Sequence, residues 1–257
     1  MNPPPTHDGV GTGAAEKSDV PVSSNTPSLS GAGPIPDIYT PDDNFAERVP
    51  CVLLLDGSAS MNDGDKIGLL NAALAAFHLD LMADPVAAVS VRTKIIRFGD
   101  EAAESILDWC EAPLFHPPTL IGRGRTPLGS GLAMAMQDIA EEKASLRARG
   151  INIRRPWLFV LTDGTPTDNW EAAAARCRAA QERDAFLLWP IGVGPDANFE
   201  VLKQLTPDGF ALEVEETRFR DLFRWLSDSM RATGPAAPAS GSPALETAPD
   251  DLFIVRD

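Results

Sequence analysis

The chain has 257 residues, of which 44% are hydrophobic, so it is long enough for one large α/β domain with a sizeable core. It carries 22 Lys and Arg against 37 Asp and Glu, for a formal charge of −15. So acidic a chain lacks the electrostatic footprint of a nucleic-acid-binding protein, and an anionic membrane surface would repel it. We therefore expect neither nucleic acid nor a membrane as a partner.

Both ends of the chain have the composition of disordered segments. Residues 1–45 are rich in Pro, Gly, Ser and Thr, and residues 234–257 repeat this pattern before an apolar patch at 252–255. Such segments cannot bury enough apolar area to offset the entropy of ordering them. We predict a disordered leader at 1–45, a folded domain at 46–233 and a flexible tail at 234–257. The patch is too short to fold alone, so it either docks as an added strand or serves as a short linear motif.

Secretion and membrane insertion find no support in the sequence. Residues 1–10 have neither the basic nor the apolar region of a secretory signal, and no stretch reaches the ~20 apolar residues of a transmembrane helix. The three cysteines, Cys51, Cys110 and Cys177, are widely spaced, which suits reduced and packed thiols. We expect a cytoplasmic protein whose cysteines have no zinc or redox role.

Between the two ends, apolar runs with strand character alternate with helical periodicity. Residues 51–55 (CVLLL) form a continuous apolar run ended by Asp-Gly, which is typical of a strand buried on both faces. Apolar residues then recur at three- and four-residue intervals over 67–81, which predicts an amphipathic helix. Residues 89–98 alternate as in a strand, and 105–109 is its expected antiparallel neighbour. A loop rich in Pro and Gly follows at 110–127.

The second half of the domain repeats this alternation. The patterns predict helices and strands in turn, with helices over residues 128–139, 172–183, 199–205 and 219–230 and strands over 157–162, 185–193 and 211–214. Such alternation implies a mostly parallel sheet covered by helices on both faces. The predicted fold class is therefore α/β, with a six-stranded central sheet in which one strand is antiparallel.

Polar loops follow the most apolar predicted strands, where sheets of this kind bind their ligands. Asp56, Ser58 and Ser60 follow the first strand, and Asp163 follows the WLFVLT strand. A third polar loop, just before a helix, carries Thr126. Two carboxylates and three hydroxyls, without His or Cys, are hard oxygen ligands that suit Mg²⁺ or Mn²⁺ better than zinc or copper. The five residues are therefore candidate metal ligands.

Other site chemistries fit these loops less well. A haloacid-dehalogenase-type phosphatase needs a nucleophilic Asp where this chain has Leu161, and Gly-Ser-Ala-Ser around Ser58 is not the G-x-S-x-G of a nucleophile elbow. The loop at 122–129 lacks the G-K-[ST] of a phosphate-binding loop. Taken singly, Asp56 and Asp163 are explained as helix N-caps. Taken with the three hydroxyls, they favour a metal site, and we predict no catalytic residue.

The order of these residues resembles a known site. D-x-S-x-S ending at Ser60, a later Thr in T-P-L-G and a strand ending in T-D-G are similar to the metal-ion-dependent adhesion site (MIDAS) of von Willebrand factor A (vWA) domains. The resemblance implies a Rossmann-like vWA fold. It also implies that Ser58 and Ser60 bind the metal through their hydroxyls and that Thr126 does so directly or through water. Asp56 and Asp163, by the same resemblance, act mostly through water and orient the serines.

Further stretches resemble one bacterial branch of these domains, the TerY-like proteins, named from tellurium resistance. They are FHPPTL at 115–120, RPWLF at 155–159, and LTDGTPTD at 161–168 with Trp170. The resemblance implies a non-enzymatic adaptor in a stress or phosphorylation pathway, whose metal binds an Asp or Glu of a partner. A protein kinase and a PP2C-type phosphatase are the partners it implies. The alternative is a vWA subunit of a metal chelatase or an AAA+ ATPase machine.

Overall fold

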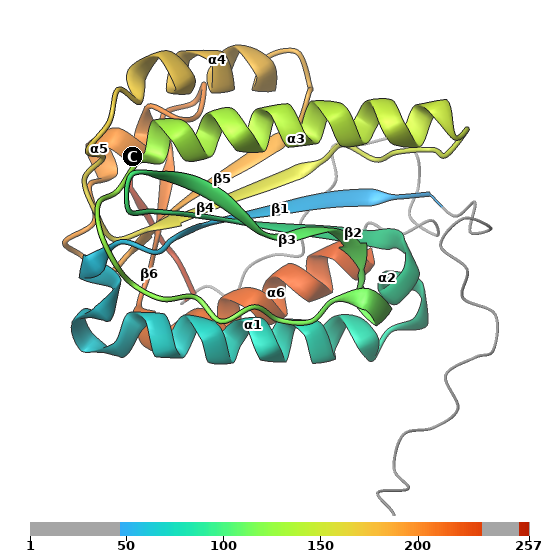
Figure 1. The fold of residues 1–257 in the computed structure, drawn as a ribbon, viewed down its shortest axis with the longest axis horizontal. Coiled ribbons are helices and arrows are strands. Elements are labelled where there is room, and N and C mark those ends of the chain that lie inside the picture. Colours follow the sequence, from blue (N-terminus) through green and yellow to red (C-terminus); the bar gives the residue numbers. More distant parts are fainter. Residues whose placement is uncertain (1–46, 233–251, 257) are drawn as a thin grey trace, which may run out of the picture. The chain divides into compact units, whose positions relative to one another are not determined.

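The structure, a computed structural model, describes residues 47–232 and 252–256. The predicted leader at 1–45 and most of the predicted tail at 234–257 lie outside the described residues. The described part is an α/β fold in which one sheet is covered by α3 and α4 on one face and by α1 and α6 on the other (Figure 1). The predicted fold class is confirmed.

The sheet has seven strands in the order β3-β2-β1-β4-β5-β6-β7. The strands are β1 (Val49–Asp56), β2 (Val91–Gly99), β3 (Ala102–Glu111), β4 (Trp157–Thr162), β5 (Leu187–Val193), β6 (Ala211–Val214) and β7 (Ile254–Arg256). Strands β2, β1, β4, β5 and β6 pair in parallel, whereas β3 and β7 are antiparallel to their neighbours. The sheet therefore has one strand more than predicted, and a second antiparallel strand, because the C-terminal patch joins it.

The helices connect these strands and cover the sheet. They are α1 (Lys66–Met82), α2 (Pro85–Ser90), α3 (Leu128–Ala148), α4 (Glu171–Gln181), α5 (Phe199–Lys203) and α6 (Phe219–Ala232), with short 3-10 helices η1 (Ala59–Asp65), η2 (Ala112–Leu114) and η3 (Glu216–Arg218). Helix α2 was not predicted, and it takes the start of the strand expected at 89–98. The side chain of Asp84 accepts hydrogen bonds from the N–H groups of Val86 and Ala87, and Pro85 occupies the first turn, so the N-terminus of α2 is stabilised locally.

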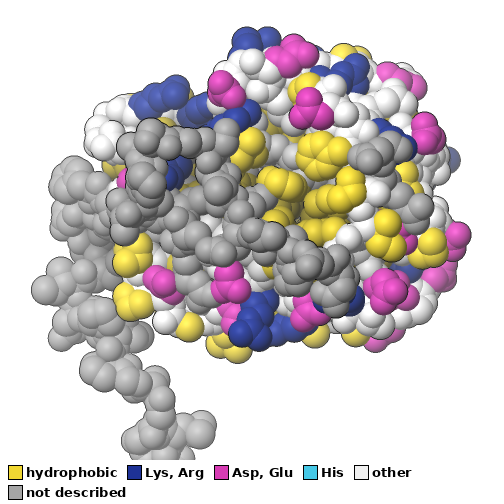
Figure 2. All heavy atoms as spheres, turned by 180° about the vertical axis from the view of Figure 1, so that it is seen from behind, with side chains coloured by type: hydrophobic (Ala, Val, Ile, Leu, Met, Phe, Trp, Pro, Cys, Tyr) yellow, Lys and Arg dark blue, Asp and Glu magenta, His cyan; other side chains and the backbone are white. Residues whose placement is uncertain are grey.

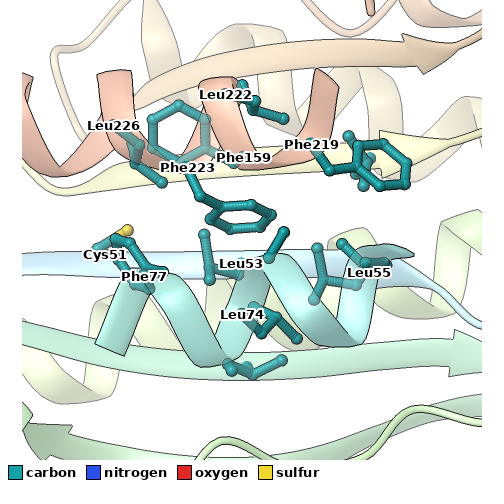
Figure 3. Close-up of a cluster of buried hydrophobic side chains, with 14 of the residues drawn as sticks. Cys51, Leu53, Leu55, Leu74, Phe77, Phe159, Phe219, Leu222, Phe223 and Leu226 are labelled. Carbon is teal, nitrogen blue, oxygen red and sulfur yellow. The ribbon is translucent and has the colours of Figure 1, made fainter. Parts of the chain in front are cut away.

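Strand β1 is an inner strand of the sheet, between β2 and β4, and is buried along its whole length. Its side chains alternate between two cores, so Leu53 and Leu55 face the cluster under α1 and α6 (Figure 3), while Val52 and Leu54 face the cluster under α3 and α4. Burial on both faces explains the continuous apolar run, as predicted. The same burial holds the carboxyl end of β1, Asp56, at the candidate metal site.

The C-terminal patch forms β7 on the outer edge of β6. Val255 lies opposite Leu212, and Phe253 packs edge-on against Trp225 with the ring centroids 5.1 Å apart. Leu252 is buried, whereas the side chains of Ile254 and Val255 are exposed. Of the two roles considered for the patch, the structure shows the added strand.

The surface mixes both signs of charge. On the face drawn in Figure 2, acidic and basic side chains lie side by side, and hydrophobic side chains gather near the middle. Among the side chains coloured in Figure 2, the acidic ones are thus not gathered into one patch. Among the helices of the described ranges, none is long and apolar enough to cross a membrane.

Candidate metal centre

Three loops meet at the carboxyl ends of β1 and β4. The two strands are parallel neighbours, so the loop after Asp56 and the loop that begins at Asp163 lie side by side. The third loop leads into α3 and carries Thr126. All five predicted metal ligands therefore lie at one end of the sheet, as the resemblance to a MIDAS implies, although whether they bind a metal stays a prediction.

A path of hydrogen bonds joins the first loop to the second. The carboxylate of Asp56 accepts from the backbone N–H of Ser58 at 2.7 Å. The Oγ atoms of Ser58 and Ser60 lie 3.0 Å apart, and Ser60 Oγ donates to Asp163 Oδ1 at 2.7 Å. Asp56 and Ser58 are buried, and Ser60 is half-buried. The path places two hydroxyls between two carboxylates.

The second contact between these loops runs through Thr162, which sequence reasoning did not single out. Thr162 Oγ1 donates to Asp56 Oδ2 at 2.5 Å and accepts from the N–H of Gly164 at 3.1 Å. A Cβ added to Gly164 would lie 3.2 Å from Thr126 Oγ1 and 3.7 Å from Asp56 Oδ2. Gly164 therefore leaves open a space that oxygen atoms from two loops border.

Burial dominates the electrostatics of Asp56. It raises the pKa of this carboxyl to about 6, although hydrogen bonds from Thr162 and Ser58 lower the pKa, and the negative charge of Asp163 adds a smaller rise. The donors that Asp56 meets, a hydroxyl and a backbone N–H, are neutral. A buried carboxylate with neutral donors gains free energy from a nearby cation.

Arg97 of β2 ties the first loop to the loop before Thr126. Its buried guanidinium donates to the carbonyl of Gly57 at 2.8 Å and to the carbonyl of Ile121 at 3.1 Å. The N–H of Arg123 also donates to the carbonyl of Gly57 at 2.8 Å. Sequence reasoning missed Arg97, because a basic residue in a strand carries no local sign of the loops it reaches.

The loop after β4 in turn holds the start of α3. Thr167 and Thr126 exchange two hydrogen bonds, one between backbone groups at 3.0 Å and one from the N–H of Thr126 to Thr167 Oγ1 at 3.1 Å. The carboxylate of Asp168 accepts from the N–H groups of Gly129 at 3.0 Å and Ser130 at 2.9 Å. Asp168 therefore caps a helix of another segment and fixes Thr126 beside the other candidates.

A cation of the chain itself reaches the site. The ammonium of Lys66, at the start of α1, lies 2.7 Å from Asp163 Oδ2. The N-cap explanation of the two Asp residues does not hold, because Ser58 is the N-cap of η1 and Trp170 that of α4. Asp56 and Asp163 instead bond the hydroxyls and backbone of the site.

The donor chemistry fits a hard divalent cation. Within the described residues there is no group of three or more His, Cys, Asp or Glu side chains that would hold a metal. The candidate centre has two carboxylates, and its other candidates are the hydroxyls of Ser58, Ser60 and Thr126. Such oxygen donors suit Mg²⁺ or Mn²⁺. The space beside Gly164 is consistent with this assignment.

The residues considered for other chemistries, namely Leu161, the described histidines and the cysteines, are engaged in the core or with the backbone. Leu161, at the position of a phosphatase nucleophile, is buried in the core. His78 and His116 each contact a backbone carbonyl, and the three cysteines are free thiols. Burial raises the pKa of Cys177 to about 12, so this thiol stays protonated.

Comparison with solved structures finds the same arrangement of strands and helices. The vWF domain of the type V pili tip protein Mfa5 from Porphyromonas gingivalis is 11% identical, and the match covers 76% of this chain and 99% of that one, with a TM-score of 0.53. The fold is that of a vWA domain. The pilus adhesin SpaC from Lactobacillus rhamnosus GG is 13% identical over 73% of this chain and 31% of SpaC, with a TM-score of 0.56. No protein-family model matches the chain, and no curated protein matches it in sequence.

Proposed function

We propose that this chain is a metal-dependent protein-interaction module. The site of Asp56, Ser58, Ser60, Thr126 and Asp163 would hold Mg²⁺ or Mn²⁺ and receive an Asp or Glu of a partner protein. The observation that carries the proposal is the path from Ser58 through Ser60 to Asp163, with contacts of 3.0 and 2.7 Å. It brings hydroxyl and carboxylate oxygens from two strand ends together, as a metal with oxygen ligands requires.

Some residues of the site would bind the metal, and others orient the residues that bind it. The hydroxyls of Ser58, Ser60 and Thr126 would hold the metal. Asp163 orients Ser60 by accepting its hydroxyl hydrogen bond. Asp56 holds the turn at Ser58 by accepting a hydrogen bond from the backbone N–H of Ser58. Because two carboxylates only balance a divalent ion, the metal, when bound, would supply an electrophilic position for an external carboxylate.

Basic residues beside the site support an acidic partner. Arg123 and Arg125 precede Thr126 in the same loop, and both are exposed. Arg123 forms an ion pair with Asp100 at 2.5 Å, so a partner carboxylate would compete with Asp100 for it. Surface charges of this kind raise the association rate more than the affinity.

The finer role rests on the resemblance to TerY-like proteins. We propose an adaptor without catalytic activity in a cytoplasmic stress or phosphorylation system, with a protein kinase and a PP2C-type phosphatase as its partners. The support is the match of FHPPTL, RPWLF and LTDGTPTD, together with a site whose described donors lack the His or Cys of a nucleophilic mechanism.

Affinity purification tests the module. Wild type, Ser60→Ala and Asp163→Ala are each used as bait with Mg²⁺ and with EDTA, and Ser145→Ala, an exposed hydroxyl on α3, serves as the matched control. We expect partners only with Mg²⁺, and only on wild type and Ser145→Ala. Recovery of the same proteins from every sample would show that the site is not the binding surface.

A further inference from the structure

We infer that Lys66 is a built-in cation of the candidate metal centre and sets how tightly the centre binds a divalent metal. This inference rests on the metal binding proposed above and adds a residue that determines its strength. The ammonium lies 2.7 Å from Asp163 Oδ2, and the Asp163 side chain is 3% exposed. The other carboxylate oxygen, Asp163 Oδ1, accepts from Ser60. Both oxygens of this candidate ligand are thus engaged, one of them by a positive charge.

The backbone before Lys66 places it there. Gly64 and Asp65 both adopt left-handed conformations, with φ of 65° and 61°, and turn the chain from η1 into α1. Glycine takes this conformation without cost, whereas Asp does so at some strain. The side chain of Asp65 lies back over Gly68, where an added Cβ would be 2.3 Å from Asp65 Oδ1. The backbone turn at Gly64 and Asp65, and not only the length of the lysine side chain, therefore directs Lys66 towards Asp163.

Lys66 also violates a local rule of helix chemistry. It is the first residue of α1, where the positive end of the helix dipole disfavours a cation, and the acidic residue next to it in the chain is Asp65, at the N-cap, since the first turn itself has none. Residues that break a local preference gain their compensation elsewhere, often at a functional site. Here the ammonium forms its ion pair with the carboxylate of Asp163, which lies 97 positions away in the sequence.

The charge of Lys66 opposes a divalent cation. Without Lys66, the two carboxylates of the centre would give it a charge of −2, whereas the ammonium cancels one of these charges. A metal that approaches Asp163 must share its carboxylate with the ammonium or displace it, and like charges a few ångströms apart repel. We expect removal of the charge to tighten metal binding by about tenfold. After metal binds, the same ammonium adds to the attraction for a partner carboxylate.

Calorimetric titration of the full chain with Mn²⁺ tests the inference. The variants are Lys66→Gln, which removes the charge, Lys66→Arg, which keeps it, and Arg220→Gln, which removes an α6 cation from its ion pair with Asp80 near the far end of α1. We expect Lys66→Gln to bind Mn²⁺ about tenfold more tightly than wild type, and the other two to bind as wild type does. Thermal unfolding by circular dichroism checks that each variant is folded.

The outcomes separate this inference from the proposed function. If wild type binds Mn²⁺ and Lys66→Gln binds it equally or more weakly, the role of Lys66 is overturned while the metal site stands. Tighter binding by Arg220→Gln as well would show a general effect of net charge and would also overturn the role. If neither wild type nor Lys66→Gln binds, the metal site itself is refuted.

Discussion

At Gly57, the absence of a side chain allows the guanidinium of Arg97 to reach the backbone of the site. A Cβ at this position would lie 2.3 Å from Arg97 Nε, closer than atoms approach. Arg97 also meets Glu104 at 2.8 Å, so it is held from both sides and has little room to retreat. This contact, together with the backbone hydrogen bond from Arg123 to Gly57, holds the loop of Ser58 against the loop of Thr126.

Gly57→Ala should therefore displace Arg97 and loosen both loops. We expect the free energy of unfolding to fall by about 2 kcal/mol or more, because buried hydrogen bonds to a charged group are lost, and we expect metal affinity to fall with it. Gly209→Ala is the control. Gly209 has a φ of +70° but nothing within 4 Å of an added Cβ, so this change should cost only about 1 kcal/mol and leave metal binding unchanged. Equal effects of the two changes on Mn²⁺ titration would contradict this account.

Among the elements, α3 depends on a cap from another segment. Its own N-cap position is Pro127, whose side chain makes no cap hydrogen bond, and Asp168 from the loop after β4 takes that role. A negative charge at a helix N-terminus is favourable both for the free N–H groups and for the helix dipole.

Asp168→Ala should lower the free energy of unfolding by about 1–2 kcal/mol and weaken metal binding, because Thr126 lies at the uncapped end of α3. Asp84→Ala is the matched control, since Asp84 caps the short helix α2. It should lower stability by a similar amount without a change in metal affinity. Urea unfolding and Mn²⁺ titration of both variants measure the two effects. Unchanged metal affinity in Asp168→Ala would show that the cap does not position Thr126.

Strand β7 is held to the domain more by Phe253, the residue just before it, than by its own three residues. Phe253 packs on Trp225, whereas Ile254 is 54% exposed. Phe253→Ala should lower the free energy of unfolding by about 1–3 kcal/mol and shift tryptophan fluorescence to longer wavelength as water reaches Trp225. Ile254→Ala, at the next position and in the strand itself, should change stability by less than about 0.5 kcal/mol. Similar losses in the two variants would mean that backbone pairing, not the aromatic contact, holds β7.

For the whole molecule, stability should come from the two cores and not from the metal. A metal at a concentration equal to its Kd stabilises the fold by about 0.4 kcal/mol, which is RT ln 2. EDTA should therefore leave the melting temperature almost unchanged. Leu54→Ala, by contrast, creates a cavity in a fully buried strand and should cost about 2–5 kcal/mol. Differential scanning calorimetry with and without EDTA measures the contribution of the metal to stability. Cooperative unfolding on chelation would show that the metal is structural.

The sequence by itself determined the alternation of strands and helices and the chemistry of the strand ends. Both are local properties. The apolar period within a window reports which faces are buried, and Asp56, Ser58 and Ser60 directly follow a run that must be a central strand. The prediction was less accurate at α2, because Val89 continues an alternation that Pro85 and Asp84 turn into a helix.

Only the tertiary structure decided which loops meet and what lies between them. The contact of Ser60 with Asp163 joins residues 103 positions apart, and it depends on β1 and β4 being neighbours in the sheet. Arg97 and Lys66 have ordinary local surroundings in the sequence, and their partners come from other segments. Strand β7 is three residues long, so its own pattern carries too little information, and the edge of β6 and the ring of Trp225 determine where it pairs. Periodicity reports the burial of a segment, whereas contacts between distant segments depend on how the whole chain packs.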